Sequence, residues 1–133
     1  MEEILEILNN KEFIEAYHKP GSNYICDPPV TNTDIDYIVL VDDILIAHKF
    51  ITKNGFRCDV EKKYILDEDR QFLSYKRYVE IDGEKKIINF ITTELPFYYK
   101  SFVFATELAK KLNIRDKTDR VDLFRIIREY WRK

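Results

Sequence analysis

The segment that most constrains the fold is a short apolar run, Asp36–Val41, with the sequence DYIVLV. Most of its residues are β-branched or aromatic, and the run is shorter than an ordinary helix, so it favours a strand. Consecutive apolar side chains point to both faces of a strand, which predicts burial on both sides. The fold must therefore contain a sheet with other layers packed against it.

Helical patterns flank this strand. Apolar residues recur at helical spacing over residues 2–17, where Asn9-Asn10 marks a potential break, and again over residues 42–54. Asp42 or Asp43 is suited to cap the second helix, and Gly55 to end it. We expect this helix to bury Ile44, Leu45, Ala47 and Ile51. Two more helices are predicted, one over about 97–112 and one from Asp116 or Asp119 onward, whose apolar face carries Val121, Phe124, Ile127 and Trp131.

The middle of the chain has β patterns. Strands are expected over residues 56–60, 72–81 and 85–92, and Asp82-Gly83 is a strong signal for a two-residue hairpin loop. In that register Ile81 pairs with Glu84, and Lys76 lies opposite Asn89. The order of elements predicts an α+β fold, a small mixed sheet with helices packed against it, and the 133 residues fit a single domain over 1–133.

Two aspartates lead into the apolar strand. Asp34 and Asp36 are separated by one residue, so their side chains are expected on the same face. Two neighbouring carboxylates need a counter-charge, and a hard cation such as Mg²⁺ binds through oxygen ligands. Upstream, Gly21 and Ser22 are suited to approach a phosphate. An alternative remains open, in which the aspartates are ordinary turn and strand-start residues and Gly-Ser is only a loop.

These stretches resemble a known group of proteins. "GS…DID" before a hydrophobic strand is similar to the nucleotidyltransferase superfamily, the DNA polymerase β-like fold. The texts GSNYICDPPVTNTDIDYIVLV, FLSYKR, INFITT and FATELAKKLNIRDKTDRVDLF resemble, more narrowly, small phage-encoded nucleotidyltransferase-like proteins. The likeness spans roughly Gly21 to Phe124, most of the chain.

The resemblance implies a minimal nucleotidyltransferase fold that binds a nucleoside triphosphate with Mg²⁺, or Mn²⁺ in its place. Asp34 and Asp36 match the catalytic, metal-binding pair, and Gly21 and Ser22 match the nucleotide-binding pair. The activity implied is transfer of a nucleoside monophosphate to a hydroxyl, and the acceptor (a protein, an RNA or a small molecule) stays open.

The chain departs from the family pattern at its third carboxylate. Asn89 stands where an aspartate is expected on a later strand, and it can offer a carbonyl oxygen to a metal but cannot act as a base. Lys76 opposite it is a candidate nucleotide contact, or simply a solvated edge-strand charge, and Glu80 is a more distant substitute carboxylate. Two further hypotheses follow: a catalytically silent binding protein that acts in sequestration or phage–host conflict, and an antitoxin-like transferase that modifies a partner toxin.

The net charge and the cysteines argue against several other classes of protein. A net charge of −2 argues against an extensive nucleic-acid surface, although basic runs occur at Lys110-Lys111 and from Arg125 to Lys133. Two distant cysteines and an acidic start without a signal-peptide pattern favour a cytoplasmic protein and no membrane partner. A zinc site from Cys26, Cys58, His18 and His48 lacks recognised ligand spacing.

Basic side chains gather at the predicted junction of the last two helices: Lys110, Lys111, Arg115, Lys117 and Arg120. Two interpretations stay open for them, contacts to a phosphate group or the solvated faces of two helices.

Overall fold

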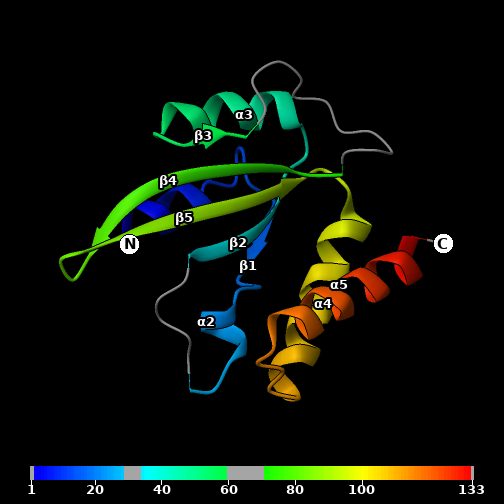
Figure 1. Cartoon of the computed structure of the whole chain (residues 1–133). Helices are drawn as coiled ribbons and strands as arrows, with labels where there is room; N and C mark the ends of the chain where they lie inside the picture. Colours follow the sequence, from blue (N-terminus) through cyan, green and yellow to red (C-terminus); the bar gives the residue numbers. More distant parts are fainter. Residues whose placement is uncertain (1, 29–33, 60–70, 133) are drawn as a thin grey trace.

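A computed structural model describes residues 2–28, 34–59 and 71–132 of the chain (Figure 1). It is an α+β fold, as the sequence predicts, in which helices pack on a small mixed sheet. The elements in chain order are α1 Glu2–Leu8, β1 Ala16–His18, α2 Ser22–Ile25, β2 Ile35–Leu40, α3 Ile44–Lys53, β3 Arg57–Cys58, β4 Leu73–Ile81, β5 Glu84–Thr93, α4 Pro96–Lys111 and α5 Lys117–Arg132.

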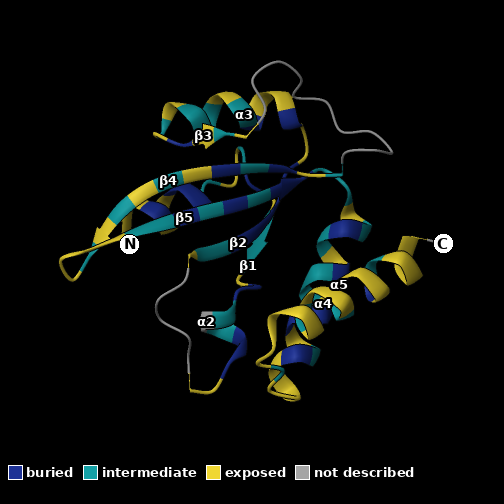
Figure 2. Cartoon of the chain, in the orientation of Figure 1, coloured by how far each residue is buried: buried dark blue, intermediate teal, exposed yellow. Residues whose placement is uncertain are grey.

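The sheet has five strands in the order β1-β2-β5-β4-β3. β2 and β5 run parallel, and the other neighbouring pairs are antiparallel. The parallel pair lies at the centre, which explains why β2 is apolar at almost every position. In Figure 2 the buried colouring follows this central part of the sheet, whereas most of α5 is exposed.

The two faces of the sheet have different partners. Tyr37 and Val39 of β2 belong to the main core, together with apolar residues of α1 and α3. Ile38 and Leu40 are also buried, and strand alternation points them to the other face, where α4 contacts β2 and β5. Figure 1 shows α3 on one side of the sheet and the pair α4 and α5 on the other.

The predicted helix over residues 42–54 is confirmed as α3, with one correction. The Asp43 side chain caps it by accepting from the Leu45 backbone N–H at 2.9 Å, and Gly55 follows its end with φ of +89°. Leu45, predicted to be buried, is 51% exposed. The helix buries Ile44, Ala47 and Ile51, and Leu45 falls outside the stripe that these spacings define.

The predicted helix over residues 2–17 is wrong in its second half. α1 ends at Leu8, and Ala16–His18 instead forms β1, an edge strand paired with β2. Asn10 explains the stop, because its side-chain oxygen accepts from the Glu12 backbone N–H at 3.2 Å and so stabilises a turn.

The hairpin prediction is confirmed. Asp82 and Gly83 have φ of +52° and +80°, as in a tight two-residue turn, and Ile81 pairs with Glu84. Lys76 lies opposite Asn89. The predicted strand over 56–60 is present as the shorter β3, and residue 60 lies outside the described part of the chain.

The last two helices are present as predicted, packed against each other. Phe124 of α5 contacts Phe102 of α4, with ring centroids 5.2 Å apart, and Ile127 is buried. Val121, which shares their predicted apolar face, is 57% exposed because it lines a cavity. No helix in the described ranges has the length and apolar character needed to span a membrane.

Candidate functional site

A row of polar residues crosses the sheet on the face opposite the main core. The strand register places Asp36 of β2 beside Asn89 of β5, and Asn89 beside Lys76 of β4. Asp34 lies just before β2 and is exposed. The position of the expected third carboxylate is therefore adjacent to the DxD pair, and asparagine occupies it.

Asn89 holds the Asp36 carboxylate. The Asn89 Nδ2 donates to Asp36 Oδ1 at 3.2 Å, while Asn89 Oδ1 accepts from Ser74 Oγ at 2.6 Å. Turning the amide over would set its oxygen against an ionised carboxylate, so the Asp36 contact favours the observed orientation. In this arrangement Asn89 presents an N–H donor toward Asp36, and its carbonyl oxygen is occupied by Ser74.

The Asp36 carboxyl is poorly solvated. Burial raises its pKa, and the nearby Asp34 carboxylate raises it further, whereas the hydrogen bond from Asn89 and the charges of Lys76 and Lys117 lower it. Burial is the largest of these influences, so the pKa of Asp36 lies above its usual value. A cation between Asp36 and Asp34 would therefore stabilise the ionised form of Asp36.

A single cavity collects the predicted residues from both motifs. Its volume is about 740 Å³, and Gly21, Ser22, Asp34 and Asp36 all line it. Gly21 and Ser22 stand at the start of α2, and the aspartates at the start of β2, so separate segments of the chain supply one site. Lys76 and Asn89 are not among the described lining residues and act on the site through Asp36.

The opposite wall of the cavity is basic. Four cationic side chains of α5 line it: Lys117, Arg120, Arg125 and Arg128. The sequence pattern pointed to Lys117 and Arg120 only as members of a helix junction, and to Arg125 only as the start of a basic run. The helical spacing of these cations is visible in the sequence. The side of the protein that they face is set by how α5 packs on α4.

Aromatic side chains form the remaining apolar part of the lining: Phe72, Tyr98, Phe102 and Phe124. The rings of Phe72 and Tyr98 stack with centroids 5.6 Å apart, and the Arg128 guanidinium lies 5.5 Å from the Tyr98 ring centroid. Burial raises the pKa of Tyr98 to about 12, although the Arg128 charge opposes this. Tyr98 therefore stays neutral at physiological pH, and the wall offers flat apolar surface beside fixed positive charge.

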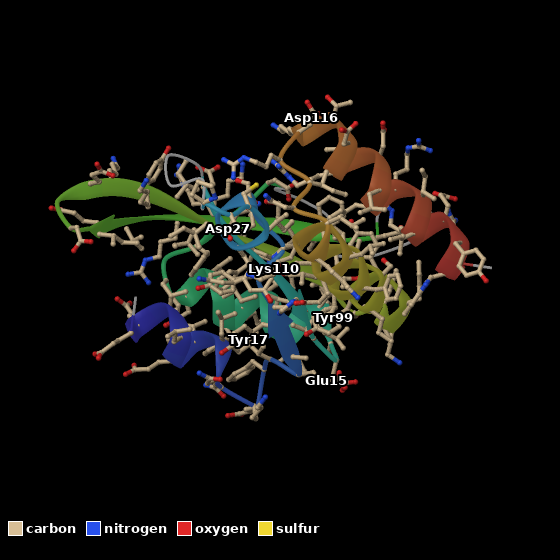
Figure 3. All side chains as sticks on the ribbon, turned by 90° about the horizontal axis from the view of Figure 1, so that it is seen from below. Glu15, Tyr17, Asp27, Tyr99, Lys110 and Asp116 are labelled. Carbon is tan, nitrogen blue, oxygen red and sulfur yellow. The ribbon has the colours of Figure 1, made fainter. Side chains whose placement is uncertain are left out.

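Two of the remaining predicted basic residues, Lys110 and Arg115, attach the α2 segment to the end of α4 and the connection to α5, whereas Lys111 is exposed. Lys110 Nζ donates to the Tyr24 carbonyl at 2.9 Å, and Arg115 donates to the Pro28 carbonyl at 2.7 Å. Asn113 exchanges two hydrogen bonds with the Asp27 backbone. Figure 3 labels Asp27 and Lys110 at this junction. These contacts fix the segment that carries Gly21 and Ser22 against the helix pair.

The two carboxylates supply only part of the coordination shell of a metal ion. Within the described residues, no group of three or more His, Cys, Asp or Glu side chains could hold a metal ion. Asp34 and Asp36 supply two carboxylates, and Mg²⁺ commonly takes one or two carboxylates and fills its other positions with phosphate oxygens and water. The two histidines of the hypothetical zinc site are engaged separately, His18 with Glu107 and His48 with Tyr75.

Comparison of the chain with protein-family models, with curated proteins and with solved structures finds no match. The geometry of the site brings two carboxylates, a Gly-Ser segment, four cations and an aromatic wall to one cavity.

Proposed function

We propose that this chain is a nucleotidyltransferase-like domain that binds a nucleoside triphosphate with Mg²⁺ or Mn²⁺ in the cavity between β2, α2 and α5. The observation that carries the proposal is the shared cavity of Gly21, Ser22, Asp34 and Asp36. Gly21 and Ser22 stand at the start of α2, and the two aspartates at the start of β2, so two different elements present these groups to the same space.

In the proposed reaction, an acceptor hydroxyl oxygen attacks the α-phosphorus of the nucleotide. The bond between that phosphorus and the bridging oxygen to the β-phosphate breaks, the hydroxyl proton passes to solvent or a nearby base, and pyrophosphate leaves. A bound divalent ion would supply charge neutralisation for the phosphate oxygens. Asp34 and Asp36 would hold that ion, and Asn89 would keep the Asp36 carboxylate in position through its 3.2 Å hydrogen bond.

Asn89 also supports a second candidate function, a silent binding protein on the same fold. At the third position it provides an N–H donor where an active site of this class would gain a carboxylate. Such a protein would sequester a nucleotide or bind a partner without chemistry. An antitoxin-like transferase that acts on a partner toxin would use the same site as the first candidate.

A thermal-shift experiment tests the metal–nucleotide site. We expect a nucleoside triphosphate and Mg²⁺ together to raise the melting temperature more than either raises it alone, because only the complex completes the coordination shell. The Asp34→Ala/Asp36→Ala variant should lose this combined effect and remain folded. Glu6→Gln/Glu12→Gln removes two exposed carboxylates outside the cavity lining; it is the matched control and should keep the effect.

A wild-type response no larger than that of the double variant would refute the site. A loss in Glu6→Gln/Glu12→Gln equal to that of the aspartate variant would point instead to a general effect of surface charge. A loss in a separate Glu80→Gln variant would identify Glu80 as a substitute ligand.

A further inference from the structure

The charges on α5 are divided between two faces of the helix. At about 100° per residue, the cations that line the cavity, Lys117, Arg120, Arg125 and Arg128, fall on one side. The acidic residues Asp119, Asp122 and Glu129 fall on the other side, and none of them is among the described lining residues. The helix therefore turns a basic face toward the cavity and an acidic face away from it.

This basic face outweighs the carboxylates that it confronts. Among the described lining residues, four basic side chains oppose only Asp34 and Asp36, which leaves an excess of two positive charges. The Lys117 charge reaches across the cavity, because it helps to lower the pKa of Asp36. The cavity thus attracts a multiply charged anion before any metal ion is added.

The four cations differ in how firmly they are held. Arg120 donates to the backbone carbonyls of Ile114 and Arg115, so it also stabilises the start of α5. Arg128 lies against the Tyr98 ring. Lys117 and Arg125 are exposed and stand two helical turns apart on the cavity wall. Arg125 also lies 3.8 Å from Asp122 Oδ1, but an ion pair between two exposed side chains contributes little to stability. Lys117 and Arg125 are therefore the residues whose replacement changes the charge of the wall with least effect on the fold.

We propose that this face of α5 is a polyphosphate-binding surface that holds the triphosphate tail of the nucleotide and binds it even without Mg²⁺. Guanidinium and ammonium groups bind phosphate oxygens through charge-assisted hydrogen bonds. The inference rests on the proposed function for the identity of the nucleotide, but binding of the anion itself depends only on α5. It assigns the phosphate contacts to Lys117 and Arg125 rather than to Lys76, which is outside the described lining.

The test uses inorganic tripolyphosphate as the probe, titrated calorimetrically into the full chain in the presence of a chelator. Wild type should bind it, with an affinity that falls as salt rises. Lys117→Gln/Arg125→Gln should lose about tenfold or more in affinity. The control Lys49→Gln/Lys53→Gln removes the same charge from exposed positions of α3, on the other side of the sheet from α5, and should change the affinity by less than about twofold.

A further double variant, which keeps both charges, controls for misfolding. Lys117→Arg/Arg125→Lys keeps both charges and should bind tripolyphosphate nearly as well as wild type. Melting temperatures of all variants should match wild type, because the exchanged residues are exposed. Absence of metal-free binding by wild type, or equal losses in the cavity variant and its control, would overturn the inference.

The aspartates separate this inference from the proposed function. Asp34→Asn/Asp36→Asn should strengthen metal-free tripolyphosphate binding, because two repelling charges are removed, and should abolish any gain from Mg²⁺. If Mg²⁺ gives no gain even in wild type while α5 variants still lose binding, the proposed function fails and the anion surface stands. If Mg²⁺ strengthens binding through the aspartates but the α5 variants bind as wild type does, the anion surface fails and the proposed function stands.

Discussion

At the scale of single residues, Asp36 shows a conflict between stability and a functional site. Its carboxyl is half-buried in β2, and burial raises its pKa. A raised pKa means that the ionised form is less favourable in the folded protein than in the unfolded chain. The resulting cost is present above the folded-state pKa and disappears as pH falls through it toward the unfolded value.

Replacing Asp36 by asparagine should therefore stabilise the protein at neutral pH. The new amide would keep the shape and could still accept from Asn89 Nδ2, but it would carry no buried charge. The melting temperature of Asp36→Asn should exceed that of wild type at pH 7, and the difference should shrink as the pH is lowered into the acid range. Asp42→Asn, at an exposed position before α3, should show no such pH-dependent gain. A wild-type protein that melts higher than Asp36→Asn at pH 7 would contradict the prediction.

Asn89 is the residue that separates an active transferase from a silent binder. If the site is active but weakened, Asn89→Asp should raise the transfer rate, because a carboxylate adds a metal ligand and a potential base, worth roughly 10²–10⁴-fold for general-base catalysis. The measurement is label transfer from each nucleoside triphosphate, with Mg²⁺ or Mn²⁺ and cell lysate as a mixed acceptor pool.

The same assay has a clear negative outcome. Transfer by wild type that disappears in Asp36→Ala supports the enzyme. No transfer by wild type or by Asn89→Asp, alongside measurable nucleotide binding, supports the silent binder. Ser74→Ala is a useful companion variant, because it removes the 2.6 Å hydrogen bond that occupies Asn89 Oδ1 and leaves the amide free to reorient.

At the scale of elements, the β4–β5 hairpin sets the register that places Asn89 beside Asp36. Its turn depends on Gly83, whose φ is +80°. A Cβ atom added to Gly83 would meet no other atom within 4 Å, so only the backbone conformation disfavours a larger residue there. Gly83→Ala should destabilise the protein by about 1–2 kcal/mol, through backbone strain alone, in urea unfolding. Gly83→Asn should lose less, since asparagine tolerates this conformation better. Equal losses in the two variants would argue against strain as the cause.

The elements that sequence reasoning identified are those whose signals are local. The hairpin follows from Asp82-Gly83, α3 from the Asp43 cap and its apolar spacing, and β2 from a run of apolar residues. Each signal lies within a few neighbouring positions, so it can be read before the fold is known.

The elements that were missed depend on distant partners. β1 is three residues long and is a strand because Ala16–His18 pairs with β2, about twenty positions or more away in the chain. The basic wall of α5 has a visible helical spacing, but its direction is set by contacts such as Phe102 with Phe124. Sequence patterns thus predicted the carboxylate and Gly-Ser half of the candidate site, and packing decided the other half.

At the scale of the whole molecule, the sheet separates a structural face from a face that carries the candidate site. The main core combines α1, α3 and one face of the sheet, and it includes the fully buried residues Leu8, Ile51 and Tyr75. The cavity lies on the other face, where α4 packs on the sheet and α2 and α5 pack on α4, and the buried cluster of Ile25, Cys26 and Ala109 there is smaller. From this division we expect the core face to supply most of the stability and so to offset the unfavourable charges of the site on the other face.

A buried isoleucine of the core face, with an exposed isoleucine as its control, tests whether the core face and the cavity are energetically independent. Ile51 of α3 is fully buried, whereas Ile126 of α5 is exposed. Ile51→Ala should lower the free energy of unfolding by about 2–5 kcal/mol, and Ile126→Ala by less than about 0.5 kcal/mol, as measured by urea denaturation. Both variants should bind tripolyphosphate with wild-type affinity under conditions where they are folded, because neither residue lines the cavity and effects at separate sites are generally additive. A marked loss of affinity in folded Ile51→Ala would show that the core face and the cavity are energetically coupled through the sheet, and the division of labour between the two faces would then be wrong.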